Sequence, residues 1–531
     1  MGGGLLQLVA YGAQDAYITG NPHITFWKVM YKRHTNFAME AFRVNFTGSP
    51  HYGQRVVAVV NRNADLIWKT YVEITLPDTT TSATGAAYNV LWTAGGQRRL
   101  GYLLLKKIEL EIGGQIIDTH YGEWLYLWEN LTANYDTSVK IDSMVGGQQG
   151  GAASTLVSCN GRPSVLYVPL QFWFCRNPGL ALPLIALQYH EVRFNITLGA
   201  ATDLVSRGSF TSVSTAANAL PQLKDMALYM DYIYLDVDER RRFAQESHEY
   251  LIDQLQYGLP QTITTSSTRI DLTLNHPVKE LVWVFQDARK ADCGSATTAT
   301  LGYTQPFSYD DIASRCRLQI NGQDRFSERY GDYFWKVQPY QHHTGGGFWP
   351  TRNEVNTVIG TPAPVTSTFT LNALTNTSFT YSALVGVLIP GMTVTGAGIT
   401  GSNVIASITP ASATGGTVVF WTSFTSTATS YTATTVYIAD DNAITSTGTS
   451  TYQAQNPINV YSFAIQPEEH QPSGTCNFSR IDTSTLVFDS IQAGGAGSFP
   501  SKAYPYVFRI YGVNYNILRI MSGMGGLAYS N

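Results

Sequence analysis

The sequence predicts an all-β protein in which two similar β-rich units follow one another along the chain. Short runs of alternating apolar and polar residues recur throughout the 531 residues, and clusters of Gly, Pro, Asn and Ser separate them. With 32 Tyr and 23 Phe beside 47 Gly and 22 Pro, the composition suits strands and turns better than long helices. An internal duplication then gives the number of units.

One sequence block occurs twice, about two hundred residues apart. The first copy reads Ile-Gly-Gly-Gln at 112–115 and Tyr-Gly-Glu at 121–123; the second reads Ile-Asn-Gly-Gln at 320–323 and Tyr-Gly-Asp at 330–332. Each copy follows a run of period two and leads into an aromatic stretch. Two such units are too few and too large for a solenoid. We therefore expect two sandwiches or barrels, with the blocks as equivalent strand-to-helix corners of structural role.

The strands and boundaries follow from the same patterns. Expected strands of the first unit are 55–60, 66–74, 107–112, 165–168, 191–196 and 226–232; those of the second are 267–274, 281–285, 315–320, 460–465, 506–511 and 514–520. The charged stretch 236–249 is the strongest change of composition between them and predicts a connector. The expected division is an arm at 1–30, a first unit at 31–237, a connector at 238–249 and a second unit at 250–531.

An unusual segment interrupts the second unit. From 355 to 467 the only charged residues are Asp440 and Asp441, and Thr, Ser, Ala and Gly dominate. A flexible linker is one interpretation, but strand-like runs at 392–395, 404–408 and 417–420 favour a β insertion, placed at 355–457. It follows the second block where the first copy carries a loop at 134–161. Expanded loops usually carry surface function.

Charge excludes one class of function and suggests another property. The formal net charge is −4, so nothing favours wrapping of nucleic acid, and we expect no direct nucleic-acid binding. The cluster Arg240-Arg241-Arg242 follows Asp236, Asp238 and Glu239 and is expected to pair locally or to lie at a boundary. Only 14% of residues are charged, against roughly 25% in soluble domains, which indicates extensive contact with other protein surfaces.

The sequence shows no recognisable targeting motif and no cysteine spacing typical of a disulfide framework or a zinc site. The first residues lack the basic and apolar regions of a secretory signal, and position six is Leu, which fails the myristoylation pattern. No run approaches the length of a membrane span. Five scattered cysteines without CxxC spacing indicate neither a disulfide framework nor a zinc site, so free thiols in a reducing cytoplasm are expected. The cysteines are Cys159, Cys175, Cys293, Cys316 and Cys476.

Candidate chemical motifs are weak, and we predict no catalytic, cofactor-binding or metal-binding residues. Residues 523–528 fit G-x-G-x-x-[GA], but that motif must open a helix after a strand and here lies at the chain's end. The pair His342-His343 has no carboxylate or cysteine at ligand spacing and is expected in an exposed loop. His190-Glu191 and the segment 120–123 have no nucleophile pattern nearby.

Five sequons occur, and only one is a glycosylation candidate. They are Asn45, Asn130, Asn195, Asn376 and Asn477. Several fall within expected strands, whereas Asn376 lies in the insertion, where a glycan is easy to place.

Long motifs in both halves and at both ends resemble a known family. They include 4–15 (GLLQLVAYGAQD), 19–22 (TGNP), 177–192 (NPGLALPLIALQYHEV), 238–240 (DER), 248–252 (HEYLI), 321–326 (NGQDRF), 472–482 (PSGTCNFSRID) and 514–528 (NYNILRIMSGMGGLA). These resemble the major capsid protein of nucleocytoplasmic large DNA viruses, the double jelly-roll family of phycodnaviruses, mimivirus and iridoviruses. Nothing in the 355–467 segment carries the resemblance, so no role for it is implied by its residues.

The resemblance implies a tandem double jelly roll, two eight-stranded β-sandwiches with the Thr/Ser-rich β insertion in the second. It implies a homotrimer of nearly hexagonal outline that tiles an icosahedral shell, with neighbouring capsomers, minor capsid proteins and penton proteins as partners. The arm with Phe26 and Trp27 would pack beneath, near an inner membrane contacted only indirectly. The insertion would form an outward tower able to contact the host surface. The implied location is the virion's outer shell, after synthesis and assembly in the host cytoplasm.

Two other classes remain open from the sequence. A β-sandwich adhesin or carbohydrate-binding surface protein would use the Thr-rich insertion as a receptor-binding tip, and hexagonal arrays would distinguish the capsid subunit from it. A cupin-type enzyme would need clustered His and carboxylate metal ligands, which the sequence does not show.

Overall fold

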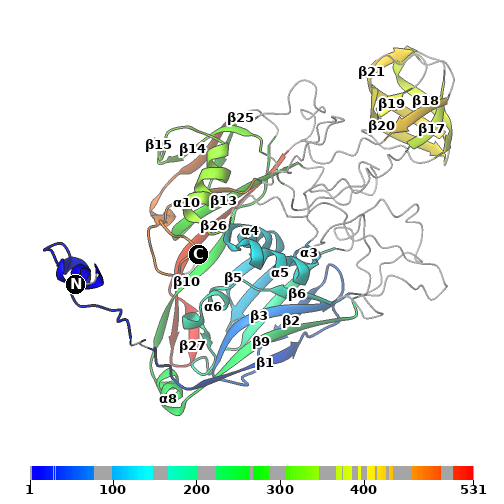
Figure 1. The fold of residues 1–531 in the computed structure, drawn as a ribbon. Coiled ribbons are helices and arrows are strands. Elements are labelled where there is room, and N and C mark those ends of the chain that lie inside the picture. The colour runs from blue at the N-terminus through cyan, green and yellow to red at the C-terminus, as the bar shows by residue number, and fades with distance from the viewer. Residues whose placement is uncertain are drawn as a thin grey trace.

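The structure is a computed structural model, and most of its described strands form four antiparallel sheets grouped into two sandwiches (Figure 1). It describes the chain except residues 1–2, 28, 30, 77–98, 147–164, 201–222, 264–266, 288–306, 308, 310, 346–365, 373–374, 386–392, 396–402, 413–414, 426–429, 435–456, 492–505 and 530–531.

The first sandwich contains a sheet of order β1-β9-β3-β6 and a sheet of order β2-β8-β4-β5. The first sheet is built from β1 (Phe37–Asn45), β9 (Asp225–Leu235), β3 (Leu66–Thr75) and β6 (Val165–Pro169), with β7 (Leu182–Pro183) paired to β3. The second is built from β2 (Arg55–Val59), β8 (Val192–Leu198), β4 (Leu105–Ile112) and β5 (Gln115–Tyr121).

The second sandwich contains a sheet of order β10-β26-β13-β23 and a sheet of order β12-β25-β14-β15. The first is built from β10 (His248–Tyr257), β26 (Tyr506–Met521), β13 (Pro277–Asp287) and β23 (Asn459–Ser462), with β11 (Gln261–Ile263), β24 (Cys476–Asn477) and β27 (Met524–Leu527) attached. The second is built from β12 (Thr268–Asp271), β25 (Ser484–Ile491), β14 (Ala313–Ile320) and β15 (Gln323–Asp324), with β16 (Arg329–Tyr330) attached.

Both sandwiches have the same connectivity. In chain order, the first, eighth, third and sixth of the eight principal strands form one sheet, and the second, seventh, fourth and fifth form the other. Two antiparallel sheets connected in this way are a jelly roll. The predicted tandem double jelly roll is therefore confirmed.

The duplicated block consists of a hairpin turn and a corner. Each turn has two residues with positive φ, Gly113 (59°) and Gly114 (86°) in one copy and Asn321 (49°) and Gly322 (77°) in the other. This is the signature of a type I′ hairpin, which matches the twist of its strands and favours Gly and Asn. The sequence repeats here because both turns require a left-handed backbone.

Each Tyr-Gly-acid corner requires glycine, because a neighbouring backbone carbonyl leaves no room for a side chain. A Cβ on Gly122 would lie 1.9 Å from the carbonyl oxygen of Tyr102, and a Cβ on Gly331 would lie 2.1 Å from that of Ala313. After these corners the chain enters α4 (Gly122–Thr132) in the first sandwich and the π-helical turn η5 (Tyr333–Val337) in the second. Only glycine lets the chain pass so close to these carbonyl oxygens.

Short helices fill the connections. In the first sandwich they are α3 (Leu100–Leu104), α5 (Tyr135–Val145), α6 (Trp173–Arg176) and the 3₁₀ turn η2 (Pro178–Leu180); in the second they are α10 (Gln338–His342) and the 3₁₀ turn η7 (Phe478–Arg480). Along the chain, α8 (Val237–Gln245) connects the two sandwiches, and the arm contains α1 (Gly3–Val9) and α2 (Ala16–Thr19). No helix within the described part of the chain has the length and hydropathy needed to cross a membrane.

Several local expectations need correction. The segment expected as a loop from 134 contains α5, because the Asn134 side chain caps its first turn and Gly146 ends it with φ 85°. The expected strands 506–511 and 514–520 are one strand, β26, since Gly512 continues the pairing with β10 and β13. The expected strand 460–465 ends at Ser462.

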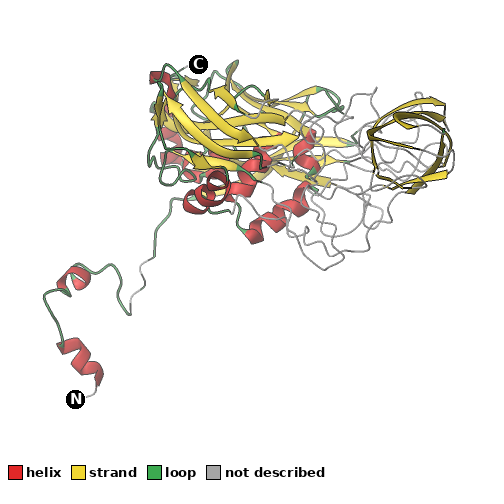
Figure 2. Cartoon of the chain, turned by 90° about the horizontal axis from the view of Figure 1, so that it is seen from above, coloured by secondary structure: helices red, strands yellow, loops and turns green. Residues whose placement is uncertain are grey.

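The insertion forms a closed barrel between α10 and β23 (Figures 1 and 2). Its strands are β17 (Thr366–Leu371), β18 (Thr375–Val385), β19 (Thr393–Thr395), β20 (Asn403–Ser412), β21 (Gly415–Thr425) and β22 (Ser430–Thr434). Alternate residues such as Phe379 and Tyr381, or Val418 and Phe420, point into its apolar core. The corresponding interval of the first sandwich contains α4 and α5.

We predict that Gly331→Ala destabilises the second sandwich, because the added methyl group would overlap the Ala313 carbonyl oxygen. Overpacking of this kind costs about 1–3 kcal/mol, so the thermal unfolding midpoint should fall by several degrees. Gly4→Ala is the control, since nothing lies within 4 Å of its Cβ position. Equal midpoints for the two variants would contradict the explanation of the corner.

Candidate functional site at the junction of the two sandwiches

One sheet of the second sandwich is buried on both faces, because it also packs against the first sandwich. Leu281, Trp283, Phe285, Phe508 and Ile510 belong to the second sandwich's own core, whereas Val282, Val284, Tyr511 and Val513 belong to the apolar cluster that contains the first sandwich's core. Strands buried on both faces read as nearly continuous apolar runs. The two sandwiches therefore share one core and cannot separate without exposing it.

Glu123 is the polar centre of this junction. It lies in the first turn of α4, forms an ion pair with Arg509 of β26, and accepts hydrogen bonds from the hydroxyls of Tyr511 and Tyr309, the latter at 3.0 Å. Burial alone would lower the pKa of Arg509, but Glu123 raises it above its usual value. Burial, followed by the Glu123 charge, raises the pKa of both tyrosines, so they remain hydrogen-bond donors.

The acid of the duplicated block thus has different roles in the two copies. Asp332, the counterpart of Glu123, pairs with Lys336 one turn later at 2.6 Å, and both side chains are about half exposed. Sequence reasoning identified the block but missed the role of Glu123. The available signal was an acid adjoining an aromatic stretch in a chain poor in charge.

Aromatic rings complete the contact around Glu123. Tyr121 lies 4.7 Å from Tyr257, which stacks on Tyr511 at 4.9 Å between ring centroids. Trp124 packs against the same Tyr511 ring at 5.4 Å. Aromatic pairs at these separations contribute about 0.5–1.5 kcal/mol beyond the area they bury. The aromatic stretch after the first block therefore belongs to the junction.

Side chains, rather than strand pairing, join the edges of β5 and β10. Asp118 Oδ1 accepts a hydrogen bond from the Leu255 amide at 3.1 Å, and the Gln254 amide group donates to the Ile117 carbonyl. A cavity of about 260 Å³ lies here, lined by residues 115–119, 254–256 and Leu527. The other oxygen of Asp118 lies 3.0 Å from His120 Nε2, and the His120 ring stacks on Phe172. His120 is thus a packed structural residue.

The glycine-rich C-terminal motif is a hairpin that packs on the first sandwich. Gly523 has φ 80° in the turn between β26 and β27, and its carbonyl accepts a hydrogen bond from the Tyr189 amide at 3.0 Å. A Cβ on Gly525 would lie 2.6 Å from Leu187, and the Gly525 carbonyl oxygen lies 2.9 Å from His190 Nδ1. These glycines allow close packing of strands, and the segment contains no helix that could open a dinucleotide site.

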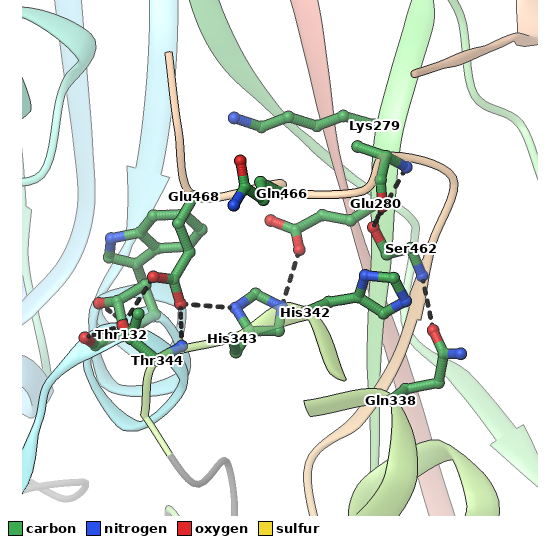
Figure 3. Close-up of polar contacts among 12 residues, drawn as sticks. Thr132, Lys279, Glu280, Gln338, His342, His343, Thr344, Ser462, Gln466 and Glu468 are labelled. Carbon is green, nitrogen blue, oxygen red and sulfur yellow. Dashed lines mark hydrogen bonds and ion pairs between the residues drawn. The ribbon is translucent and has the colours of Figure 1, made fainter. Parts of the chain in front are cut away.

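The expectation that His342-His343 lies in an exposed loop is wrong: His342 is the half-buried last residue of α10, and His343 follows it with a buried side chain. Its side chain is buried between Glu280 of β13 and Glu468, with each ring nitrogen 3.0 Å from one carboxylate oxygen (Figure 3). Local spacing could not reveal this contact, because Glu468 follows His343 by 125 residues. Among the described residues no group of three or more His, Cys, Asp or Glu is placed to hold a metal ion.

A second buried ion cluster lies in the first sandwich. Arg99 is fully buried and contacts Glu129 Oε2 at 2.9 Å and Asp142 Oδ1 at 2.6 Å. The Tyr102 hydroxyl donates to the same Glu129 oxygen at 2.7 Å. Burial raises the pKa of Glu129 to about 7, although Arg99 and Tyr102 oppose the shift. The cluster ties α3, α4 and α5 together.

The basic cluster on α8 pairs less locally than expected. Arg240 Nε lies 3.0 Å from Oδ1 of Asp65, the residue directly before β3. Arg242 Nε lies 3.7 Å from Oε1 of Glu246, one turn later in the chain. Arg240 therefore does not form the predicted local pair, whereas α8 does lie at the boundary between the two sandwiches along the chain, which is the other predicted position of the cluster.

The remaining predicted residues are located as follows. Cys175 and Cys316 are buried and Cys476 is half-buried, and these three thiols are free; Cys159 and Cys293 lie outside the described residues. Asn376 lies in β18 with its backbone paired to Phe424. Its side chain is not among those described, so glycosylation at Asn376 stays a prediction.

Comparison with known proteins gives a consistent result along the whole chain. Residues 25–236 match the family described as "Major capsid protein N-terminus", and residues 239–356 and 445–526 match "Large eukaryotic DNA virus major capsid protein". The sequence is 39% identical to the major capsid protein of Pyramimonas orientalis virus and 34% identical to that of Paramecium bursaria Chlorella virus 1, each over the full length of both chains.

Solved structures agree with the sequence matches. The capsid subunit in the quasi-atomic structure of the PBCV-1 virus capsid is 30% identical, with a TM-score of 0.60 over 96% of this chain and 100% of the other. The Faustovirus major capsid protein, at 12% identity and a TM-score of 0.57, shares the fold and covers 96% of this chain and 94% of its own.

We predict that Arg509→Met destabilises the protein by about 3 kcal/mol, because removing one member of a buried ion pair leaves the other charge unpaired. Arg519→Met on the same strand is the matched control, since Arg519 pairs with Glu249 at an exposed position. Its loss should cost less than about 1 kcal/mol. Denaturant unfolding measures both, and comparable losses would contradict the central role of Glu123.

Proposed function

The chain belongs to the major capsid proteins of large eukaryotic DNA viruses, and we propose that three copies form a pseudo-hexagonal capsomer. Its role is structural rather than enzymatic: it is a virion protein of an icosahedral capsid, as its homologues are. As a subunit of such a shell, it assembles with neighbouring capsomers. The trimer itself is our proposal.

The observation that carries this proposal is the identical strand order of two sandwiches joined by a shared core. Three chains around a threefold axis would present six similar lobes, and a tile with six similar lobes can meet six neighbours in an equivalent way. A charged fraction of only 14% further supports large protein interfaces. The fixed junction between the sandwiches would hold the two lobes of each chain at a constant angle.

The N-terminal arm supports contact with another protein. No side chain of α1 or α2 is buried, and Phe26 and Trp27 are 98% and 90% exposed. Figure 2 shows the arm running away from the sandwiches. A monomer rarely exposes so many large apolar residues in one segment. We propose that this arm packs beneath the capsomer, against minor capsid proteins.

The finer division of the chain and its other partners are also proposals. The arm 1–30, the two jelly rolls 31–237 and 250–531, the connector 238–249 and the insertion 355–457 would be the functional segments. The insertion would form a surface tower able to contact the host. Penton proteins would be further partners, the inner membrane would be contacted only indirectly, and nucleic acid would not be bound directly. Synthesis and assembly would take place in the host cytoplasm.

We predict that the purified protein has a mass of about 175 kDa in solution, three times the 58.3 kDa chain. Obligate interfaces bury thousands of Å² and resist dilution, so the trimer should persist in conditions that dissolve the shell. Sedimentation velocity measures the mass, and negative-stain images should show hexagonal outlines. A folded monomer at low micromolar concentration would refute the trimer.

We also predict that deleting residues 1–27 leaves folding intact but prevents assembly of shells. No described side chain of this segment is buried and all but Asp15 are exposed, so its loss should change the thermal midpoint by no more than about 2 °C. Thermal unfolding and trimer mass provide the folding readout, and particle counts after co-expression with the minor proteins provide the assembly readout. Normal shell yield would exclude a role for the arm.

A further inference from the structure

Four segments that are distant in the sequence meet around His343. Glu280 belongs to β13, His343 and Thr344 follow α10, Glu468 follows β23, and Thr132 ends α4 of the first sandwich. Figure 3 shows the His343 ring between the two carboxylates. We call these five residues the His343 clasp. It lies between the chain leading into the insertion and the chain returning from it.

The clasp is held by short polar contacts. Thr344 donates its amide hydrogen to Glu468 Oε1 at 2.8 Å, and its hydroxyl lies 2.6 Å from Glu468 Oε2 and 2.9 Å from the Thr132 carbonyl oxygen. The next residue, Gly345, donates its amide hydrogen to the Leu131 carbonyl at 2.7 Å. Both flanks of the insertion are thereby tied to each other and to the first sandwich.

The geometry around the ring favours a charged imidazole. Nε2 lies 3.0 Å from Glu280 Oε2, and Nδ1 lies 3.0 Å from Glu468 Oε1. The contact of Nδ1 with Glu468 has hydrogen-bond geometry, whereas Nε2 and Glu280 Oε2 form an ion pair in which neither atom has a hydrogen-bond partner. In a neutral ring whose proton is on Nδ1, the Nε2 lone pair would face the buried Glu280 carboxylate, so imidazolium suits both contacts best. The side chains of His343 and Glu280 are fully buried, and among the described residues His343 is the one cation within ion-pair distance of Glu280.

We propose that the His343 clasp is a proton-dependent latch that fastens the base of the insertion to the junction of the two sandwiches. In the protonated form, one cation joins two carboxylates from different segments. When the proton leaves, the fully buried Glu280 carboxylate and the partly exposed Glu468 carboxylate no longer have a cation between them. The segments 343–345 and 465–468 then separate from β13 and α4. This device goes beyond the proposed role in the shell and does not depend on it.

The sign of the pH dependence follows from the charges around the ring. Burial alone would lower the pKa of His343, but Glu280 and then Glu468 raise it from 6.5 to about 9. Protonation therefore stabilises the closed clasp fully below pH 6.5, and this contribution is lost as the pH rises to about 9. Loss of one proton corresponds to as much as about a tenfold change in the opening equilibrium per pH unit within that window.

Several other titratable groups lie near the clasp, and Lys279, Arg176 and His342 have partners outside it. Lys279 of β13 contacts Asp253 of β10 at 3.0 Å, and Arg176 of α6 approaches the same carboxylate at 3.5 Å. Tyr515 of β26 has a pKa raised by burial and then by Asp253 and Glu280. The preceding His342 contacts the Ile465 carbonyl oxygen through Nδ1 at 3.0 Å.

Three further groups close to the clasp in sequence must be considered in a test. Glu129 of α4, with its pKa of about 7, pairs with Arg99 and titrates in the same window. Glu469 and His470 follow Glu468 directly. All of these groups remain in a His343 variant, which therefore isolates the contribution of the ring.

Hydrogen exchange of the full-length protein from pH 6 to 10 tests the latch. Protection factors, corrected for intrinsic exchange, are followed in peptides covering 338–345 and 462–470. In the unaltered protein they should fall by up to about tenfold per pH unit between pH 6.5 and 9 and then level off. In His343→Gln, protection should be low already at pH 6 and should lack this slope. Peptides from β9 are the internal control and should show no such slope.

Two further variants keep the outcome decisive. His342→Gln removes the neighbouring ring and should retain the slope. Glu468→Gln removes one of the two carboxylates at a partly exposed position. The levelling point, which is the pH above which the protection factors stop falling, should therefore move down by about one pH unit. A wild-type slope in His343→Gln overturns the proposal. If that variant does not fold, an unchanged levelling point in Glu468→Gln overturns it instead.

Discussion

The structure depends on one constraint: the sheet β10-β26-β13-β23 is covered on both faces. One face closes the second sandwich, and the other shares a core with the first. Any charge on this sheet must be paired, since an isolated buried charge is strongly unfavourable. Its buried charges meet this condition: Lys279 pairs with Asp253, Glu280 with His343, and Arg509 with Glu123. Three separate ion pairs in a chain of low charge thus have one common cause.

The same constraint explains why the two sandwiches behave as one body. Glu123 and the rings around it come from the first sandwich, whereas Arg509 and Tyr511 come from the second. Arg176 of the first sandwich likewise approaches Asp253 of the second. Apolar burial supplies most of the contact energy, and the ion pairs fix the relative position of the sheets, since misplacing them would leave charges unpaired. A subunit with two lobes at a fixed angle suits a regular shell.

The sequence was sufficient for those features that depend on local backbone chemistry. The paired turns at Gly113-Gly114 and Asn321-Gly322 require positive φ, and this requirement is visible as a repeated motif. Period-two runs likewise located β3, β4 and β14 within a few residues. The sequence was not sufficient where partners lie far apart along the chain. His343 was expected to be exposed because Glu280 and Glu468 are remote in sequence, and Asp65 was not foreseen as the partner of Arg240 for the same reason.

The duplicated block has the same backbone requirements in both sandwiches, but its side chains and the chain that follows it have different roles. Both copies keep the glycine of the corner, because a Cβ would collide with a carbonyl in each. The adjoining acids are free to differ: Glu123 serves the junction, while Asp332 makes an exposed pair with Lys336. The interval after the corner holds α4 and α5 in one copy and a six-stranded barrel in the other. Growth at this point leaves both sandwiches intact, because the contacts of Thr344 and Glu468 hold the flanking segments together at its base. The backbone of the two lobes can therefore stay alike while one of them carries a large addition.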